Sequence, residues 1–110
     1  MKTRSASISS ATIQAVADRI ATRFSPDKVI LFGSRAWGEP RADSDVDLMV
    51  IMDSDERPAR RSARISMECR PPFVAMDIMV RTPAEIEARL RIHDPFIGRI
   101  LREGVVLYAR

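Results

Sequence analysis

Four short apolar runs divide the chain into segments with different hydrophobic periods. The runs are rich in β-branched residues and cover residues 29–32, 48–51, 73–80 and 105–108. Their length and composition are typical of strands in a buried sheet. Between them, apolar residues recur every three or four positions, as in helices with one buried face. The pattern predicts an α/β (α+β) fold, in which a small mixed sheet is flanked by helices.

Capping residues and prolines mark where the helices begin. Ser10 is expected to cap a first helix, which Ser25 and Pro26 end. Thr82 and Glu85 have the spacing of a capping box. Further helices are predicted at about 58–69, 82–91 and 94–104, each with a proline in its first turn. We therefore expect the helices to alternate with the strands along most of the chain.

Length and charge limit the functions that the chain can perform. A chain of 110 residues is expected to form one domain, 1–110, with no room for a separate substrate domain. The net charge of +3 is carried mainly by arginine, which favours phosphates and acidic partners. Aromatic residues make up 5% of the chain, so direct nucleic-acid binding is not expected.

Two further absences in the sequence bear on location and chemistry. No apolar segment has membrane-spanning length, and residues 1–10 are too polar for a signal peptide, so we expect a cytoplasmic protein that binds no membrane. The one cysteine, Cys69, excludes an internal disulfide and is expected to be a buried free thiol. The one histidine, His93, is expected to pack or cap a helix, because no nucleophile accompanies it.

The candidate chemistry lies where two of the apolar runs meet polar residues. The first run leads directly into Gly33 and Ser34, and a glycine there allows backbone to approach an anion. Asp45 and Asp47 introduce the second run, and side chains two apart on a strand share a face. Asp77 interrupts the third run, where a lone charge would be costly to bury. Paired carboxylates repel unless a cation lies between them, which favours Mg²⁺ or Mn²⁺.

Each of these motifs has a plainer interpretation. An Asp-x-Asp pair after a turn is common loop or capping chemistry, and Asp77 alone is explained by pairing with an arginine. Ser34 alone is explained as an ordinary helix N-cap. None of these interpretations accounts for all five residues together. Their combination favours a metal-assisted reaction on a nucleotide.

The ordered motifs resemble a known family. The Gly33-Ser34 turn, the pair Asp45 and Asp47, and the later strand carboxylate Asp77 resemble the nucleotidyltransferase domains of the DNA polymerase β-like superfamily. The resemblance covers roughly residues 29–80. The short length is most similar to the minimal nucleotidyltransferase (MNT) domains, and it implies the nucleotidyltransferase fold.

The resemblance implies a role for each matching residue. Gly33 and Ser34 would hold the β- and γ-phosphates of ATP, and Asp45 and Asp47 would bind two Mg²⁺ ions. Asp77 matches the third carboxylate, which helps to hold one metal and draws the proton from the attacking hydroxyl. For two neighbours, the alternatives stay open. Arg35 would bind a phosphate or form a surface ion pair, and Trp37 would stack on a base or cover a local apolar patch.

The resemblance also implies a partner. Some MNT proteins act as antitoxins of HEPN-domain toxins by transferring AMP to a toxin tyrosine, and the missing acceptor domain here agrees with that role. Two alternatives remain. One is a small-molecule nucleotidyltransferase, for example one acting on an aminoglycoside, which would need an acceptor pocket. The other is a binding module that neutralises its partner by occlusion, without catalysis.

One expectation concerns the helix over residues 58–69. Ala59, Ser62, Ala63, Ser66 and Met67 are predicted to form one side of it. The other side is predicted to be a basic stripe, formed by Arg57, Arg60, Arg61 and Arg64. Such a stripe is a solvated face or a docking strip for acidic partners or phosphates.

Overall fold

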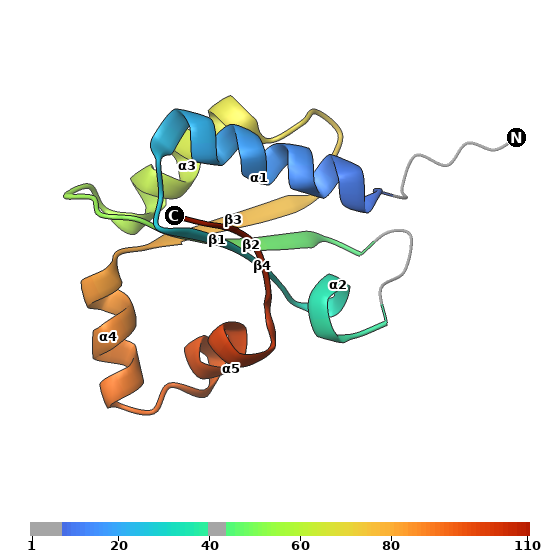
Figure 1. The fold of residues 1–110 in the computed structure, drawn as a ribbon. Helices are drawn as coiled ribbons and strands as arrows, with labels where there is room; N and C mark the ends of the chain where they lie inside the picture. Colours follow the sequence, from blue (N-terminus) through green and yellow to red (C-terminus); the bar gives the residue numbers. More distant parts are fainter. Residues whose placement is uncertain (1–7, 40–43) are drawn as a thin grey trace, which may run out of the picture.

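The computed structural model describes residues 8–39 and 44–110, which form helices around a single sheet (Figure 1). Their elements are α1 (Ser10–Phe24), β1 (Lys28–Phe32), α2 (Ser34–Trp37), β2 (Val46–Ile51), α3 (Pro58–Cys69), β3 (Met76–Arg81), α4 (Pro83–Arg91), α5 (Pro95–Glu103) and β4 (Val105–Ala109). The strand order is β3-β2-β1-β4. β1 is antiparallel to β2 and β4, whereas β2 and β3 are parallel. The predicted small mixed sheet flanked by helices is confirmed.

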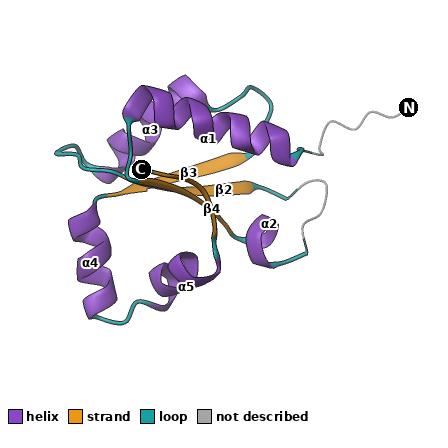
Figure 2. Ribbon diagram, viewed as in Figure 1, coloured by secondary structure: helices purple, strands orange, loops and turns teal. Residues whose placement is uncertain are grey.

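Helices cover both faces of the sheet (Figure 2). α1 and α3 pack on one face, where alternate strand residues such as Val29, Leu48 and Ile78 join the buried core. α4 and α5 pack on the other, over Ile30 and Met49. Strands buried on both faces explain why the apolar runs are nearly continuous in sequence. No helix of the described residues is long and apolar enough to cross a membrane.

Two predicted boundaries are wrong for local reasons. The N-cap of α1 is Ser9, whose hydroxyl accepts the Thr12 N–H at 3.1 Å, so Ser10 is the first helical residue. The third strand begins at Met76 rather than at Phe73. Phe73 has φ 64°, which a strand cannot continue through, and its side chain is fully exposed.

The single cysteine and the single histidine both have structural positions in the described part of the chain. Cys69 is free and buried as predicted, and burial raises the pKa of its thiol, so it is a poor nucleophile. The His93 side chain is exposed, so the packing role is wrong. Its backbone instead ends α4. With φ 56°, His93 donates its N–H to the Leu90 carbonyl, and Asp94 donates to the Arg89 carbonyl.

The predicted faces of α3 are wrong at Arg61. The buried residues of α3 are Arg61, Ile65 and Cys69, which are spaced by four, whereas Met67 is 85% exposed. The basic stripe therefore lacks Arg61. Arg57, Arg60 and Arg64 are exposed, and Arg64 is paired with Glu56.

Arg61 is buried because it connects three elements. Its guanidinium donates to both carboxylate oxygens of Glu85 at 2.8 and 3.2 Å, and its Nε donates to the Glu56 carbonyl at 2.7 Å. Glu85 also accepts the Thr82 N–H as part of the capping box of α4. The Arg61 hydrogen bond, together with that N–H, holds the pKa of Glu85 below its ordinary value. Arg61 thus attaches α3 to the start of α4.

Replacing Arg61 by methionine is expected to lower the free energy of unfolding by about 2–3 kcal/mol, because the Glu56 carbonyl and the Glu85 carboxylate lose their shared donor. The matched control is Arg60→Met, an exposed change on the same helix that should cost at most about 0.5 kcal/mol. Urea denaturation of the three proteins measures the difference. Equal midpoints for the two variants would contradict the role of Arg61.

Candidate active site

The glycine turn follows directly from the end of β1. Gly33 has φ 82°, a backbone conformation that favours glycine, and its carbonyl accepts the N–H groups of Ala36 and Trp37. Gly33 therefore occupies the N-cap position of the short helix α2, and Ser34 is its first residue. The interpretation of Ser34 as an N-cap is wrong. Its side chain is exposed at the end of the strand.

The strand pairing brings two of the acids side by side. Asp47 of β2 is the register partner of Asp77 in β3, and on its other side it is the partner of Phe32 in β1. Register partners direct their side chains to the same face of a sheet. Both acids lie on the face that carries α4 and α5, because their strand neighbours Leu48 and Ile78 belong to the opposite core. Asp45 stands just before β2.

The electrostatic surroundings of Asp47 are unfavourable to its negative charge. Burial raises the pKa of Asp47, and the charges of Asp77 and then Asp45 raise it further. Asp45 and Asp77 are both exposed, whereas Asp47 lies partly buried between them. The close approach of Asp77 to Asp47 that the sequence predicts is present, whereas the roles of the three acids in binding metal stay predictions. The half-buried carboxylate has two anionic neighbours and would be stabilised by a cation.

Gly33 and Asp47 are in close contact, which joins the two sequence motifs into one site. A Cβ added to Gly33 would clash with the Oδ2 atom of Asp47. Only glycine leaves the space that this carboxylate occupies. The Gly33 turn and Asp47 are therefore neighbours at the same end of the sheet.

The acids alone do not form a closed metal site. Among residues 8–39 and 44–110, no group of three or more His, Cys, Asp or Glu side chains is arranged to hold a metal ion. The predicted three-carboxylate site is thus not preassembled. Mg²⁺ in nucleotide sites is commonly held by one or two carboxylates together with substrate phosphates and waters. The pair Asp47 and Asp77, with Asp45 beside it, fits a metal that binds with its nucleotide.

Arg35 and Trp37 take up structural positions beside the turn. Arg35 donates from Nε and Nη2 to the Ser44 carbonyl at 3.0 and 2.9 Å, which joins α2 to the loop entering β2. The two alternatives given for Arg35, a phosphate contact and an ion pair, stay predictions. Trp37 packs against the apolar cluster under α5, as the patch-covering alternative predicts.

Residues of α5 near this site were missed by the sequence analysis. The Phe96 ring meets Phe32 edge-on, and Arg99 lies over the ring of Trp37. No local sequence pattern indicates that Arg99 contacts α2. A contact between residues so far apart in sequence follows only from the tertiary fold.

The comparisons with known proteins agree with this geometry. Residues 14–110 match the sequence profile of the family described as "Polymerase beta, Nucleotidyltransferase". The chain belongs to this polymerase β nucleotidyltransferase family. The search of curated proteins gave no significant match.

A solved structure shares the fold of this nucleotidyltransferase domain. It is described as a "putative nucleotidyltransferase" from Sulfolobus solfataricus, determined at 1.40 Å resolution. The two chains are 20% identical and align with a TM-score of 0.65, covering 91% of this chain and 79% of the other. At this identity the likeness concerns the fold alone.

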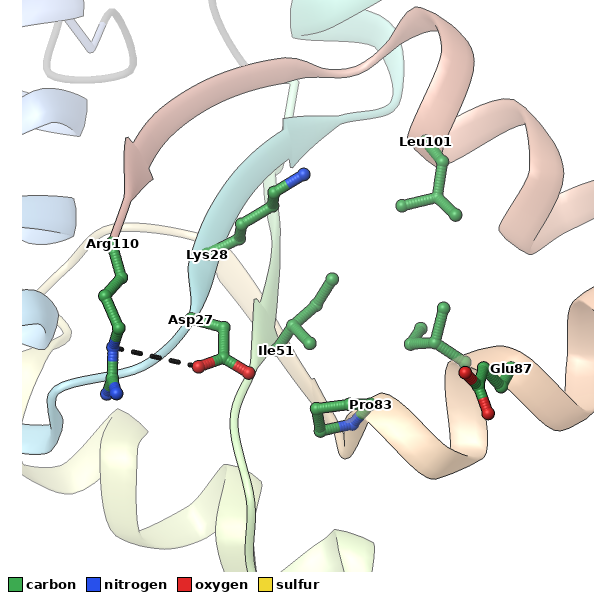
Figure 3. Close-up of a pocket in the computed structure, with 8 residues that line it drawn as sticks. Asp27, Lys28, Ile51, Pro83, Glu87, Leu101 and Arg110 are labelled. Atoms are coloured by element: carbon green, nitrogen blue, oxygen red, sulfur yellow. Dashed lines mark ion pairs between the residues drawn. The ribbon is translucent and has the colours of Figure 1, made fainter.

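A cavity on the same sheet face lies away from the acids. It has a volume of about 490 Å³, and Ile51, Ile86 and Leu101 form much of its lining, with the ion pair of Arg110 and Asp27 at its edge (Figure 3). The strand residues that line the cavity are Lys28 and Ile51. They lie four positions along their strands from Phe32 and Asp47, which is about 13 Å. A molecule bound there would not reach the carboxylates directly.

Proposed function

We propose that this nucleotidyltransferase transfers AMP from ATP to a hydroxyl group, the tyrosine hydroxyl of a HEPN-domain partner, and so acts as the antitoxin of a toxin–antitoxin pair. The observation that carries the proposal is the position of Asp47, in register with Asp77 and in contact with Gly33. Family membership supplies the class of reaction. The identity of the acceptor rests on the resemblance to minimal nucleotidyltransferases.

Each residue has a defined part in the reaction. Asp45, Asp47 and Asp77 would hold Mg²⁺, which when bound neutralises the phosphate charge and stabilises the entering and leaving oxygens. Gly33 and Ser34 would orient the triphosphate beside these acids. The acceptor oxygen attacks the α-phosphorus, the bond from that phosphorus to the bridging oxygen breaks, and pyrophosphate leaves. The carboxylate of Asp77 takes the acceptor proton.

The shape of the site supports a macromolecular acceptor. The acids lie at one end of the strands, and the strand residues that line the apolar cavity beside α4 and α5 are about 13 Å from them, too far to present a small acceptor for attack. Exposed apolar side chains also stand on the helices of that face, at Leu90, Ile92 and Phe96. These features favour a protein partner over an aminoglycoside-like substrate.

The proposal is tested by incubating the purified chain with Mg²⁺, ATP and the protein product of the neighbouring gene. The ATP is labelled at its α-phosphate in one reaction and at its γ-phosphate in a second. AMP transfer labels the partner only in the first reaction. Label from the γ-phosphate would indicate phosphoryl transfer and overturn the assignment.

A third outcome would favour the binding-module alternative. If the two proteins bind but neither label reaches the partner, the chain would neutralise it by occlusion. Asp45→Asn separates the two alternatives in cells, because an occluding protein would still protect fully against the toxin, whereas a transferase would not.

A further inference from the structure

The position of the glycine turn depends on the short helix that follows it. Trp37, the last residue of α2, is half-buried, and its ring centroid lies 6.4 Å from that of Phe32. Phe32 is the register partner of Asp47 and meets the ring of Phe96 at 5.6 Å and 82°. A continuous cluster of rings therefore runs from the strand beside the acids to α5.

A cation on α5 covers this cluster from the outside. The Cζ atom of Arg99 lies 4.3 Å from the ring centroid of Trp37, within cation–π distance. Its Nε donates to Glu103 one turn later on the helix at 3.2 Å, which restrains the guanidinium over the ring. Trp37 is thus held between Phe32 of β1 and Arg99 of α5. Within α2, Arg35 supplies a separate attachment by donating to the Ser44 carbonyl, whereas Trp37 is the residue whose ring meets β1 and α5.

We propose that Arg99 is a positioning residue for nucleotide binding. By stacking on Trp37 it holds α2, and through α2 it holds Gly33 and Ser34 against the carboxylate of Asp47. The inference rests on the proposed function, because it takes this turn to receive the phosphates of ATP. Arg99 acts through Trp37 rather than on the reacting atoms, so its loss weakens nucleotide affinity before it affects the chemical step.

The only tryptophan of the chain reports on this contact directly. The fluorescence of Trp37 is followed while ATP is added in the presence of Mg²⁺, without any acceptor. The variants are Arg99→Ala, which removes the stacking group, and Arg99→Lys, which retains a cation. The matched control is Arg102→Ala, an exposed arginine on the same helix that does not stack on Trp37. Thermal unfolding of each variant is measured in parallel.

We expect Arg99→Ala to weaken ATP binding about two- to fivefold, the range for one cation–π contact at an exposed site. Arg99→Lys should recover part of the affinity, and Arg102→Ala should bind as the wild type does. A lower unfolding midpoint for Arg99→Ala with unchanged ATP affinity would assign Arg99 a purely structural role and overturn the inference. If the wild-type protein itself bound no ATP, both the proposed function and this inference would be wrong.

Discussion

Replacing Asp47 by asparagine is expected to slow nucleotidyl transfer by about 100- to 1,000-fold, because it removes the carboxylate that we propose as a ligand of the catalytic metal. The same change is expected to stabilise the protein in the absence of metal and nucleotide. An asparagine removes one of the facing like charges, which is worth about 0.5–1 kcal/mol. Activity and stability should therefore change in opposite directions.

The pH dependence of unfolding distinguishes the removal of the Asp47 charge from a general gain in stability. Burial and the neighbouring acids raise the pKa of Asp47 above its ordinary value of 3.8. The folded chain therefore holds that proton more tightly than the unfolded chain. As the pH rises from about 3.8, the stability contributed by this group falls until the folded pKa is passed. The extra stability of Asp47→Asn relative to the wild type should therefore be absent below pH 3.8 and complete above the folded-state pKa of Asp47.

Denaturation of the wild type, Asp47→Asn and the control Asp53→Asn across this pH range measures the effect. Asp53 is an exposed acid just after the other end of β2, so its replacement should change neither stability nor activity appreciably. Addition of Mg²⁺ with ATP should raise the unfolding midpoint of the wild type but not of Asp47→Asn. A stabilised variant with full activity would remove Asp47 from the catalytic site.

Replacing Gly33 by alanine is expected to have the second large effect. The new methyl group would clash with the Asp47 carboxylate, and φ 82° is strained for any residue with a Cβ. We expect a loss of about 1–3 kcal/mol in the free energy of unfolding. Displacement of the turn or the carboxylate by about 1 Å should reduce transfer by about 100-fold.

A second glycine supplies the control for this prediction. Gly98 lies inside α5, where a Cβ would meet only the flexible end of Arg102. Gly98→Ala should raise the free energy of unfolding by about 0.5–1 kcal/mol, because alanine favours the helix. Steady-state kinetics and urea denaturation of both variants test the pair. Full activity in Gly33→Ala would show that the turn and Asp47 do not need their close contact.

The parts of the site that could be predicted are those encoded locally. The turn at Gly33 and the pair Asp45 and Asp47 each stand beside an apolar run, so the strand that positions them is visible in the sequence. Asp77 stood out because a charge interrupted an apolar run. Its registration with Asp47 depends on the parallel pairing of β2 and β3, which only the structure shows.

The failures came from side chains whose partners lie on other elements. Arg61 is predicted to belong to the basic stripe of α3, yet its spacing matches that of the buried residues Ile65 and Cys69. The buried charge of Arg61 is compensated by an ion pair with Glu85, which lies far from it along the chain. The contact of Arg99 with Trp37 was missed for the same reason. Sequence periodicity indicates which face is apolar, but it does not identify which polar side chains have partners inside.

The connection of Arg61 to Glu85 has a consequence for the acids at the far end of the sheet. A one-residue slip of β3 along β2 would turn Asp77 to the opposite face, away from Asp47. β3 is an edge strand with a single neighbour in the sheet. Arg61 is hydrogen-bonded to Glu85 in the first turn of α4, just after the end of β3. Although Arg61 is remote from the acids, it thereby helps to keep Asp47 and Asp77 aligned. Replacing it would reduce nucleotidyl transfer even though every residue of the candidate active site is unchanged.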